Sequence, residues 1–458
     1  MEIEQIKTDI ENMRKFFSSN QTKSIEFRIN QLEKLKDIIQ KNQEKIMVAL
    51  KDDLNKSFFE SYETEIGITL SELTHTIKNL KKWSKPQKVK TPITAFPAKS
   101  YIKKVPYGVT LIMSPWNYPF NLTFAPLIGS MAGGNCSLIK VSEYSPRTSQ
   151  IIEKLINENF NPNYIKVWQG EIEVNKEILN QKFDYIFFTG STNVGKIVMK
   201  AACENLTPLT LELGGKSPCI VDKNTNIDKT AKRIAWGKYL NAGQTCVAPD
   251  YLLAHKDIKE ELIEKIVYYI EKFYSQDPKQ SPDYPRIISS KHFDMLIPLI
   301  ENSEIYYGGE KDSQEKYISP TIINNVKWTD KIMENEIFGP ILPVIVWEDL
   351  DYTINLINKR PRPLALYLFT NDKELEEKVL NNIIFGGGVI NDTIMHLSNP
   401  YLPFGGVGAS GMGGYHGKYS FETFTHNMSI MKRGFWPDIK LKYPPYSGKL
   451  DTLRKLLK

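Results

Sequence analysis

The sequence has few cysteines and few histidines for its length. Six histidines and four cysteines are spread over 458 residues, and the cysteines are Cys136, Cys203, Cys219 and Cys246. They have neither the paired spacing of a zinc site nor the density of a disulfide scaffold, so we expect a reducing, cytoplasmic compartment. The histidines lack metal-ligand spacing and the signature of a cysteine–histidine protease, so we predict no metal. Residues 1–5 are acidic, whereas a secretory signal would begin with basic and then apolar residues, so we expect no secretory signal.

Most of the chain carries no excess charge. The formal net charge is +6, and residues 427–458, with eight basic and two acidic side chains, account for all of it. No basic stripe with interleaved aromatic residues precedes this tail, which argues against a nucleic-acid-binding protein. We favour a solvated basic tail, and a weak contact of the tail with an anionic membrane surface is the alternative.

One long uncharged run, residues 105–139, is interrupted by four prolines. Proline breaks the hydrogen-bond ladder of a helix, and unpaired backbone groups are costly in lipid, so the run does not fit a membrane-spanning helix. It predicts buried strand and loop inside a large domain.

The composition and the pattern of apolar residues indicate a folded α/β protein of two or three domains. Hydrophobic residues make up 41% of the chain and charged residues 24%, which are ordinary values for soluble proteins. The apolar residues between Ile25 and Ile39 recur at steps of three and four, which predicts an amphipathic helix. Residues 83–106, rich in Lys and Pro, predict an extended arm. Beyond the arm, strand-like runs (109–113, 137–141, 165–168, 185–188, 209–213, 217–221 and 251–254) alternate with helical patterns, which predicts parallel βαβ units.

A glycine-containing turn follows the strand-like run that ends at Thr189. Gly190, Ser191 and Gly195 lie between this run and a helical pattern, and such a turn favours a phosphate group at the helix N-terminus. Thr192 stands where the common dinucleotide fingerprint has its second glycine, so this turn alone is a weak signal. A tight strand-to-helix turn without a ligand is an equally good interpretation.

Two residues have the chemistry of a nucleophile and a base. Cys246 lies in a glycine-containing loop, where a thiolate could attack a carbonyl and form a thioester. Glu212 lies in an otherwise apolar strand, where burial would raise its pKa toward the range of a general base. A solvent-facing Glu212 is the alternative, and the other three cysteines are expected to be inert.

These residues together resemble the aldehyde dehydrogenase superfamily, and most closely its class 3 branch, which includes fatty aldehyde dehydrogenases. The match extends from about Glu65 to His426. It depends on seven motifs in order: Pro115-Trp-Asn117-Tyr-Pro119, Lys140-Val-Ser-Glu143, Phe188-Thr-Gly-Ser191, Leu211-Glu212-Leu-Gly-Gly-Lys216, Gly243-Gln-Thr-Cys246, Glu336-Ile-Phe338-Gly-Pro340 and Pro403-Phe-Gly-Gly406.

The resemblance implies a role for each matched residue. Cys246 would be the nucleophile, Glu212 the general base, and Asn117 an oxyanion donor through its side-chain amide. The implied cofactor contacts are Lys140 and Glu143 at the adenosine ribose, Gly190, Ser191 and Gly195 at the pyrophosphate turn, and Leu213, Glu336 and Phe338 at the nicotinamide end. Tyr118 and Thr245 would line an apolar substrate pocket, with ordinary core packing as the alternative. The cofactor would be NAD, because Glu143 would repel a 2′-phosphate, although class 3 relatives often accept NADP as well.

The resemblance also implies the architecture. We expect a Rossmann-like NAD(P)-binding domain from residues 1–82 and 107–211, an α/β catalytic domain from 212–417, and a small β oligomerisation element from 83–106 and 418–445. Residues 446–458 would form the basic C-terminal tail, and the enzyme would be a cytoplasmic homodimer. The expected reaction is oxidation of medium- or long-chain aliphatic or aromatic aldehydes to carboxylic acids. A CoA-acylating dehydrogenase and a non-catalytic structural protein of the same fold are the alternatives.

Overall fold

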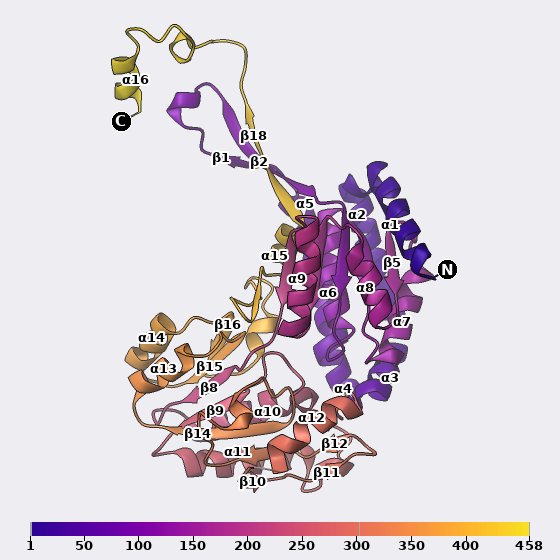
Figure 1. Ribbon diagram of the computed structural model, residues 1–458, viewed down its shortest axis with the longest axis vertical. Coiled ribbons are helices and arrows are strands. Elements are labelled where there is room, and N and C mark those ends of the chain that lie inside the picture. Colours follow the sequence, from indigo (N-terminus) through magenta and orange to yellow (C-terminus); the bar gives the residue numbers. More distant parts are fainter. Residues whose placement is uncertain (1, 302, 458) are drawn as a thin grey trace.

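The computed structural model describes residues 2–301 and 303–457, so Lys458 of the predicted tail lies outside the described residues. The described chain forms two α/β units, each built on its own sheet, and an arm that extends away from both of them (Figure 1).

The first unit is a six-stranded sheet covered by helices. Its strand order is β17-β7-β6-β3-β4-β5, and all neighbours are parallel except β17 and β7. The strands are β3 (Val109–Met113), β4 (Cys136–Lys140), β5 (Ile165–Trp168), β6 (Tyr185–Thr189), β7 (Leu209–Glu212) and β17 (Gly411–Met412). The helices are α1 (Glu2–Ser18), α2 (Ile25–Lys41), α3 (Gln43–Leu54), α4 (Phe58–Ser61), α5 (Gly67–Trp83), α6 (Asn121–Gly133), α7 (Pro146–Asn157), α8 (Ile172–Asn180) and α9 (Thr192–Glu204), with a π-helical turn η2 (Tyr62–Ile66) between α4 and α5.

The second unit is a seven-stranded sheet in the order β10-β13-β14-β9-β8-β15-β16, parallel except for β10. Its strands are β8 (Pro218–Val221), β9 (Tyr251–His255), β10 (Ile305–Tyr307), β13 (Thr321–Ile323), β14 (Ile341–Trp347), β15 (Ala365–Phe369) and β16 (Gly387–Ile390). A hairpin joins β11 (Lys311–Asp312) to β12 (Tyr317–Ile318), and the helices are α10 (Ile227–Tyr239), α11 (Lys259–Tyr274), α12 (Ser290–Glu301), α13 (Leu350–Asn358) and α14 (Lys373–Asn382).

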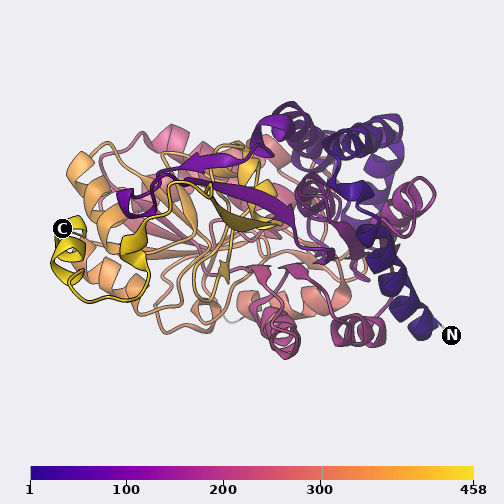
Figure 2. The same cartoon turned by 90° about the horizontal axis from the view of Figure 1, so that it is seen from above.

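The arm is a three-stranded antiparallel sheet made from two distant parts of the chain. β2 (Lys99–Pro106) pairs along its length with β18 (Thr425–Lys432), and β1 (Gln87–Val89) covers the other edge of β2. The short helix α15 (Lys418–Thr423) leads into β18, and the chain ends in the exposed helix α16 (Leu450–Leu456). Figure 1 shows the arm and tail standing away from both units, so in the view from above they lie in front of the body (Figure 2).

The structure confirms the amphipathic helix, now α2, the parallel βαβ pattern and the extended arm. Two details differ from the sequence prediction. The uncharged run contains a buried helix, α6, where we expected loop, because a helix that is apolar on all sides can be stable when fully covered, even with Pro126 inside it. Gly411 and Met412, which we assigned with the catalytic segment, pair with Leu211 and Glu212 of the first sheet. Among the described residues, no helix combines the length and apolarity needed to cross a membrane.

Candidate active site

The site lies where parallel strands of the first sheet end. Lys140 ends β4, Thr189 ends β6 and Glu212 ends β7, and the loop that carries Asn117 follows β3. The chain runs from β3 to β4 and β5 on one side of β3 and then crosses to β6 and β7 on the other side, so the strand order reverses between β3 and β6. Ligands of open α/β sheets bind at such a switch point, beyond the carboxyl ends of the strands.

A cavity of about 660 Å³ runs along this edge. Four of the predicted cofactor residues line it, namely Lys140, Glu143, Gly190 and Ser191. The Lys140 ammonium donates to the Val141 carbonyl at 2.6 Å and lies 3.5 Å from the Glu143 carboxylate, which places groups of both charges at one end of the cavity. Burial lowers the pKa of Lys140.

The wall near Ser191 suits an anionic group. Ser191 caps α9 by accepting the N–H of Val194 at 3.4 Å, so the unpaired donors of the helix N-terminus lie at the cavity. The lining residues therefore fit a dinucleotide, with its ribose near Lys140 and its pyrophosphate near Ser191.

Gly195 does not line this cavity. A Cβ atom there would lie 2.7 Å from Cδ2 of Leu213, so glycine allows α9 to pack closely on the segment after β7. The structure thus gives Gly195 a packing role, where the resemblance implied a place among the cofactor contacts.

An inner cavity of about 270 Å³ continues from the first and collects the other predicted residues. Asn117, Glu212, Leu213, Cys246, Glu336 and Phe338 all line it. The Glu336 carboxylate lies against Gly214, where a Cβ atom would be 2.0 Å from Oε2, so any side chain at that position would displace the carboxylate. Burial, together with the nearby Asp250, raises the pKa of Glu336 to about 8.

A third cavity, of about 330 Å³, lies on the other side of Cys246. Cys246 and Glu212 line both the inner cavity and this third one. Tyr118 and Thr245, the predicted pocket residues, line the third cavity and share a hydrogen bond of 2.6 Å between their hydroxyls. The Cys246 thiol is therefore reachable from two directions.

Burial controls the electrostatics of the two reactive groups. Glu212 is 3% exposed, and within residues 2–301 and 303–457 neither carboxylate oxygen has a hydrogen-bond partner. Desolvation raises the pKa of Glu212 well above its ordinary value. Burial, with the nearby Glu336 and Glu212, also raises the pKa of the Cys246 thiol to about 12, whereas the backbone N–H groups of Cys246 and Val247 oppose that rise. The thiol is protonated at neutral pH and must lose its proton before it can attack.

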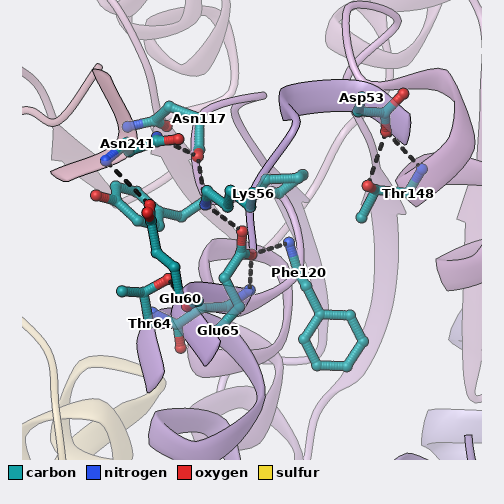
Figure 3. A network of polar contacts seen from close by, with 12 residues as sticks. Asp53, Lys56, Glu60, Thr64, Glu65, Asn117, Phe120, Thr148 and Asn241 are labelled. Carbon is teal, nitrogen blue, oxygen red and sulfur yellow. Dashed lines mark hydrogen bonds and ion pairs between the residues drawn. The ribbon is translucent and has the colours of Figure 1, made fainter. Parts of the chain in front are cut away.

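Asn117 is fixed on both its side chain and its backbone. Its side-chain amide donates to the Gln244 carbonyl at 3.1 Å, two residues before Cys246. Its backbone carbonyl accepts from Lys56 Nζ at 3.2 Å and from Asn241 Nδ2 at 2.8 Å (Figure 3). The Asn117 and Cys246 loops are therefore in direct contact.

Sequence reasoning missed several residues of the site. Trp116 and His292 line the two cofactor-side cavities, and the His292 ring bonds to the Phe338 carbonyl at 2.7 Å. The third cavity is completed from distant segments by residues that carried no shared spacing: Trp236, Ile394, Leu397, Phe404, Tyr415 and His416. No pattern along the chain links such residues. No three His, Cys, Asp or Glu residues come together to hold a metal ion in the described chain, and the absence of a metal stays a prediction.

Comparisons with known proteins show what the chain is similar to. The model of the aldehyde dehydrogenase family matches residues 1–430. The chain is 51% identical to 4,4'-diaponeurosporen-aldehyde dehydrogenase of Staphylococcus aureus, over 97% of each chain, and 43% identical to an aldehyde dehydrogenase of Rattus norvegicus described as dimeric and NADP-preferring, over 97% of this chain and 99% of that one. A solved structure described as the substrate-bound state of Staphylococcus aureus AldH superposes with a TM-score of 0.97 at 50% identity, over 99% of both chains.

Proposed function

The chain belongs to the aldehyde dehydrogenase family, whose family 3 members are among its relatives, and we propose that it oxidises apolar aldehydes at Cys246. The reaction type is that of the family: an aldehyde is oxidised to a carboxylic acid with NAD or NADP as the hydride acceptor. The single observation that carries the proposed site is the position of Cys246 and Glu212, which line both the inner cofactor-side cavity and the third cavity.

The first step is addition of the Cys246 sulfur to the aldehyde carbon. The thiol loses its proton to solvent, the thiolate sulfur forms a bond to the carbonyl carbon, and the carbonyl oxygen becomes an alkoxide. Asn117 supports this step because one N–H of its amide is held by the Gln244 carbonyl, which leaves the second to donate to the oxygen. The backbone N–H of Cys246 would supply the other donor.

Oxidation and hydrolysis complete the reaction. The cofactor supplies the hydride acceptor, so the carbon loses a hydride and becomes a thioester of Cys246. Glu212 then takes a proton from water, hydroxide adds to the thioester carbon, and the carbon–sulfur bond breaks to release the acid. Glu212 suits this role because no other group holds its carboxylate in the described chain. Its presence also favours water over CoA as the final acceptor.

The residues around the cavities support the choice of cofactor. Lys140 and Glu143 would bind the adenosine ribose, Ser191 the pyrophosphate, Glu336 the nicotinamide ribose, and Leu213 and Phe338 the nicotinamide ring. Glu143 disfavours a 2′-phosphate and Lys140 attracts one, so NAD is the expected cofactor and NADP is also accepted.

The third cavity supports an aliphatic or aromatic substrate. Its walls are mostly apolar side chains, with Trp236, Leu240, Ile394, Leu397 and Phe404 among them. Burial of a hydrocarbon chain there is favourable by about 0.8 kcal/mol for each methylene group. Medium- and long-chain aldehydes are therefore the expected substrates, and aromatic aldehydes fit the same surface.

We also propose the assembly and compartment that the resemblance implies. Residues 1–82 and 107–211 would form the cofactor domain, residues 212–417 the catalytic domain, and residues 83–106 and 418–445 the element that joins two subunits. The exposed side chains of Ile93, Phe96, Met431 and Trp436 on and beside the arm support a homodimer, because isolated apolar surface of this kind is costly in water. The four unpaired thiols support a reducing, cytoplasmic compartment, and the basic tail at 446–458 would remain solvated.

A panel of aldehydes, assayed for NADH and NADPH formation with and without CoA, tests the proposal. We expect turnover without CoA and a rate that rises with alkyl chain length at low substrate concentration. Cys246→Ala should form no reduced cofactor. A strict requirement for CoA, or an active Cys246→Ala variant, would contradict the proposed chemistry.

A further inference from the structure

A short segment that carries Lys56, Glu60 and Glu65 lies behind the two loops that carry Asn117 and Cys246. The segment runs from Lys56 through α4 and η2 to Glu65 (Figure 3). Lys56 Nζ lies 2.6 Å from Glu65 Oε1, and both side chains are fully buried. A buried ion pair rarely adds net stability, because desolvation of the charges offsets their attraction. Its significance therefore lies in the groups that the pair holds.

The pair holds the Asn117 loop at four of the five residues from Asn117 to Asn121. Lys56 Nζ donates to the Asn117 carbonyl at 3.2 Å and lies 4.0 Å from the centre of the Tyr118 ring. The second oxygen of Glu65 accepts the N–H groups of Phe120 at 2.8 Å and Asn121 at 3.1 Å, where α6 begins. The ammonium and the carboxylate thus fix the backbone on both sides of the proposed oxyanion donor.

Glu60 holds the turn that leads to Cys246. Its Oε1 accepts the N–H of Asn241 at 2.9 Å, and its side chain is 6% exposed. Asn241 and Ala242 have φ angles of 52° and 51°, a left-handed conformation that is unfavourable for residues other than glycine. Such residues keep this conformation only when surrounding contacts impose it. The Glu60 contact is one of these.

The two loops come from different units of the protein. Asn117 follows β3 of the first sheet, whereas Cys246 precedes β9 of the second. Asn241 Nδ2 bridges them by donating to the carbonyls of Asn117 at 2.8 Å and Gln244 at 3.1 Å. The position of Asn241 therefore affects the distance between the nucleophile and the oxyanion donor.

We propose that Lys56, Glu60 and Glu65 are positioning residues that set the geometry between Asn117 and Cys246. The proposal depends on the roles given above to Asn117 and Cys246. Lys56 and Glu65 fix one loop and Glu60 fixes the other. All three lie on one short segment, with three residues between Lys56 and Glu60 and four between Glu60 and Glu65. A displacement of about 1 Å in such a site can slow a reaction about 100-fold.

The test compares three enzymes by rapid mixing with NAD and a saturating aldehyde. In Glu60→Ala the Asn241 N–H loses its acceptor, and we expect the first-turnover rate of NADH formation to fall about 10- to 100-fold. In Glu60→Gln the amide oxygen can still accept that N–H, and we expect a rate within about threefold of the parent. The KM for NAD should remain close to the parental value in both, because the Lys140 and Ser191 end of the cavity is unchanged.

Asp53→Ala is the matched control. Asp53 is also a buried carboxylate of the helical region, and it accepts the backbone N–H of Arg147 at 3.1 Å and of Thr148 at 2.7 Å (Figure 3). It contacts neither loop, so its loss should lower the melting temperature without slowing the first turnover. If Glu60→Ala does not fold, Glu60→Asp, which shortens the carboxylate by one methylene, takes its place with the same expected slowing.

Two results would overturn the proposal. One is a parental first-turnover rate in Glu60→Ala, or in Glu60→Asp where that variant replaces it. The other is equal slowing in Asp53→Ala, which would mean that general loss of stability causes the effect. Failure of the proposed function is distinguishable from both, because it would appear as NADH formation by Cys246→Ala in otherwise parental enzyme.

Discussion

Glu212→Gln should separate oxidation from hydrolysis in this enzyme. The substitution keeps the shape of the side chain and removes its ability to accept a proton. Both Glu212 oxygens lack a partner among the described residues, so the change breaks no hydrogen bond that the structure records. The fold and the nucleophile should therefore remain intact, and the effect should appear only in the step that needs a base.

The size of the effect follows from the surroundings of Glu212. Its side chain is 3% exposed, and the walls of both adjoining cavities shield it, so bulk water provides no substitute base. A general base contributes about 10²- to 10⁴-fold to a rate. We expect steady turnover to fall by this factor while the first turnover still yields one NADH for each Cys246.

The pH dependence should change as well. Burial raises the pKa of Glu212, so its carboxyl gives up its proton only at a higher pH than an exposed glutamate would. The base forms as the pH rises through that raised pKa, and steady turnover of the parent should rise with it. The Glu212→Gln variant should lose this rise.

Rapid mixing with NAD and aldehyde, followed through the absorbance of NADH, measures both phases. Glu63→Gln is a suitable control because Glu63 lines the third cavity but is solvent-exposed. It should keep the burst and the steady rate. Unchanged steady turnover in Glu212→Gln, or loss of its burst, would refute the assignment of Glu212 as the base for hydrolysis.

Three further predictions concern stability and the nucleophile. Lys56→Met leaves the buried Glu65 carboxylate unpaired and should lower the free energy of unfolding by about 3–5 kcal/mol. The double variant Lys56→Met/Glu65→Gln should recover part of this loss, and equal urea midpoints for the single and double variants would contradict the prediction. The pKa of Glu336 is raised from 4.5 to about 8, so between these pH values the folded state keeps a proton that the unfolded chain has lost. The melting temperature should therefore fall as the pH rises from about 5 to about 8, and it should fall less steeply in Glu336→Gln. The pKa of Cys246 is raised to about 12, so its alkylation by iodoacetamide should accelerate about tenfold per pH unit between about pH 7 and pH 9. Mass spectrometry measures the alkylation at Cys246, and a pH-independent rate would argue against a protonated thiol.

Much of the fold followed from local patterns. The five parallel strands of the first sheet appear as apolar runs and helix α2 as an apolar stripe, and the structure places them within one or two residues of the expected bounds. Strand β17 was not predicted. Helix α6 escaped prediction because its residues are apolar on every side, so it has no stripe that distinguishes a helix from a buried strand or loop.

Some residues of the site could be predicted from the sequence, and others could not. Cys246, Glu212 and Asn117 were accessible from the sequence because each lies in a motif with a recognisable order. Lys56 and Glu65 gave no such signal, since charged residues in a helical region are usually exposed and only the structure shows them fully buried.

The sequence by itself determined the candidate reactive groups, the alternation of strands and helices up to β9 apart from α6, and the resemblance to the family. Only the tertiary structure decided which distant side chains surround Cys246, which carboxylates are desolvated, and how the two loops are held together. The physical reason is that motifs and periodicity record contacts between residues close in sequence. Burial and the pKa shifts it causes depend instead on segments far apart in the sequence, such as Glu60 and Asn241, which are 181 residues apart.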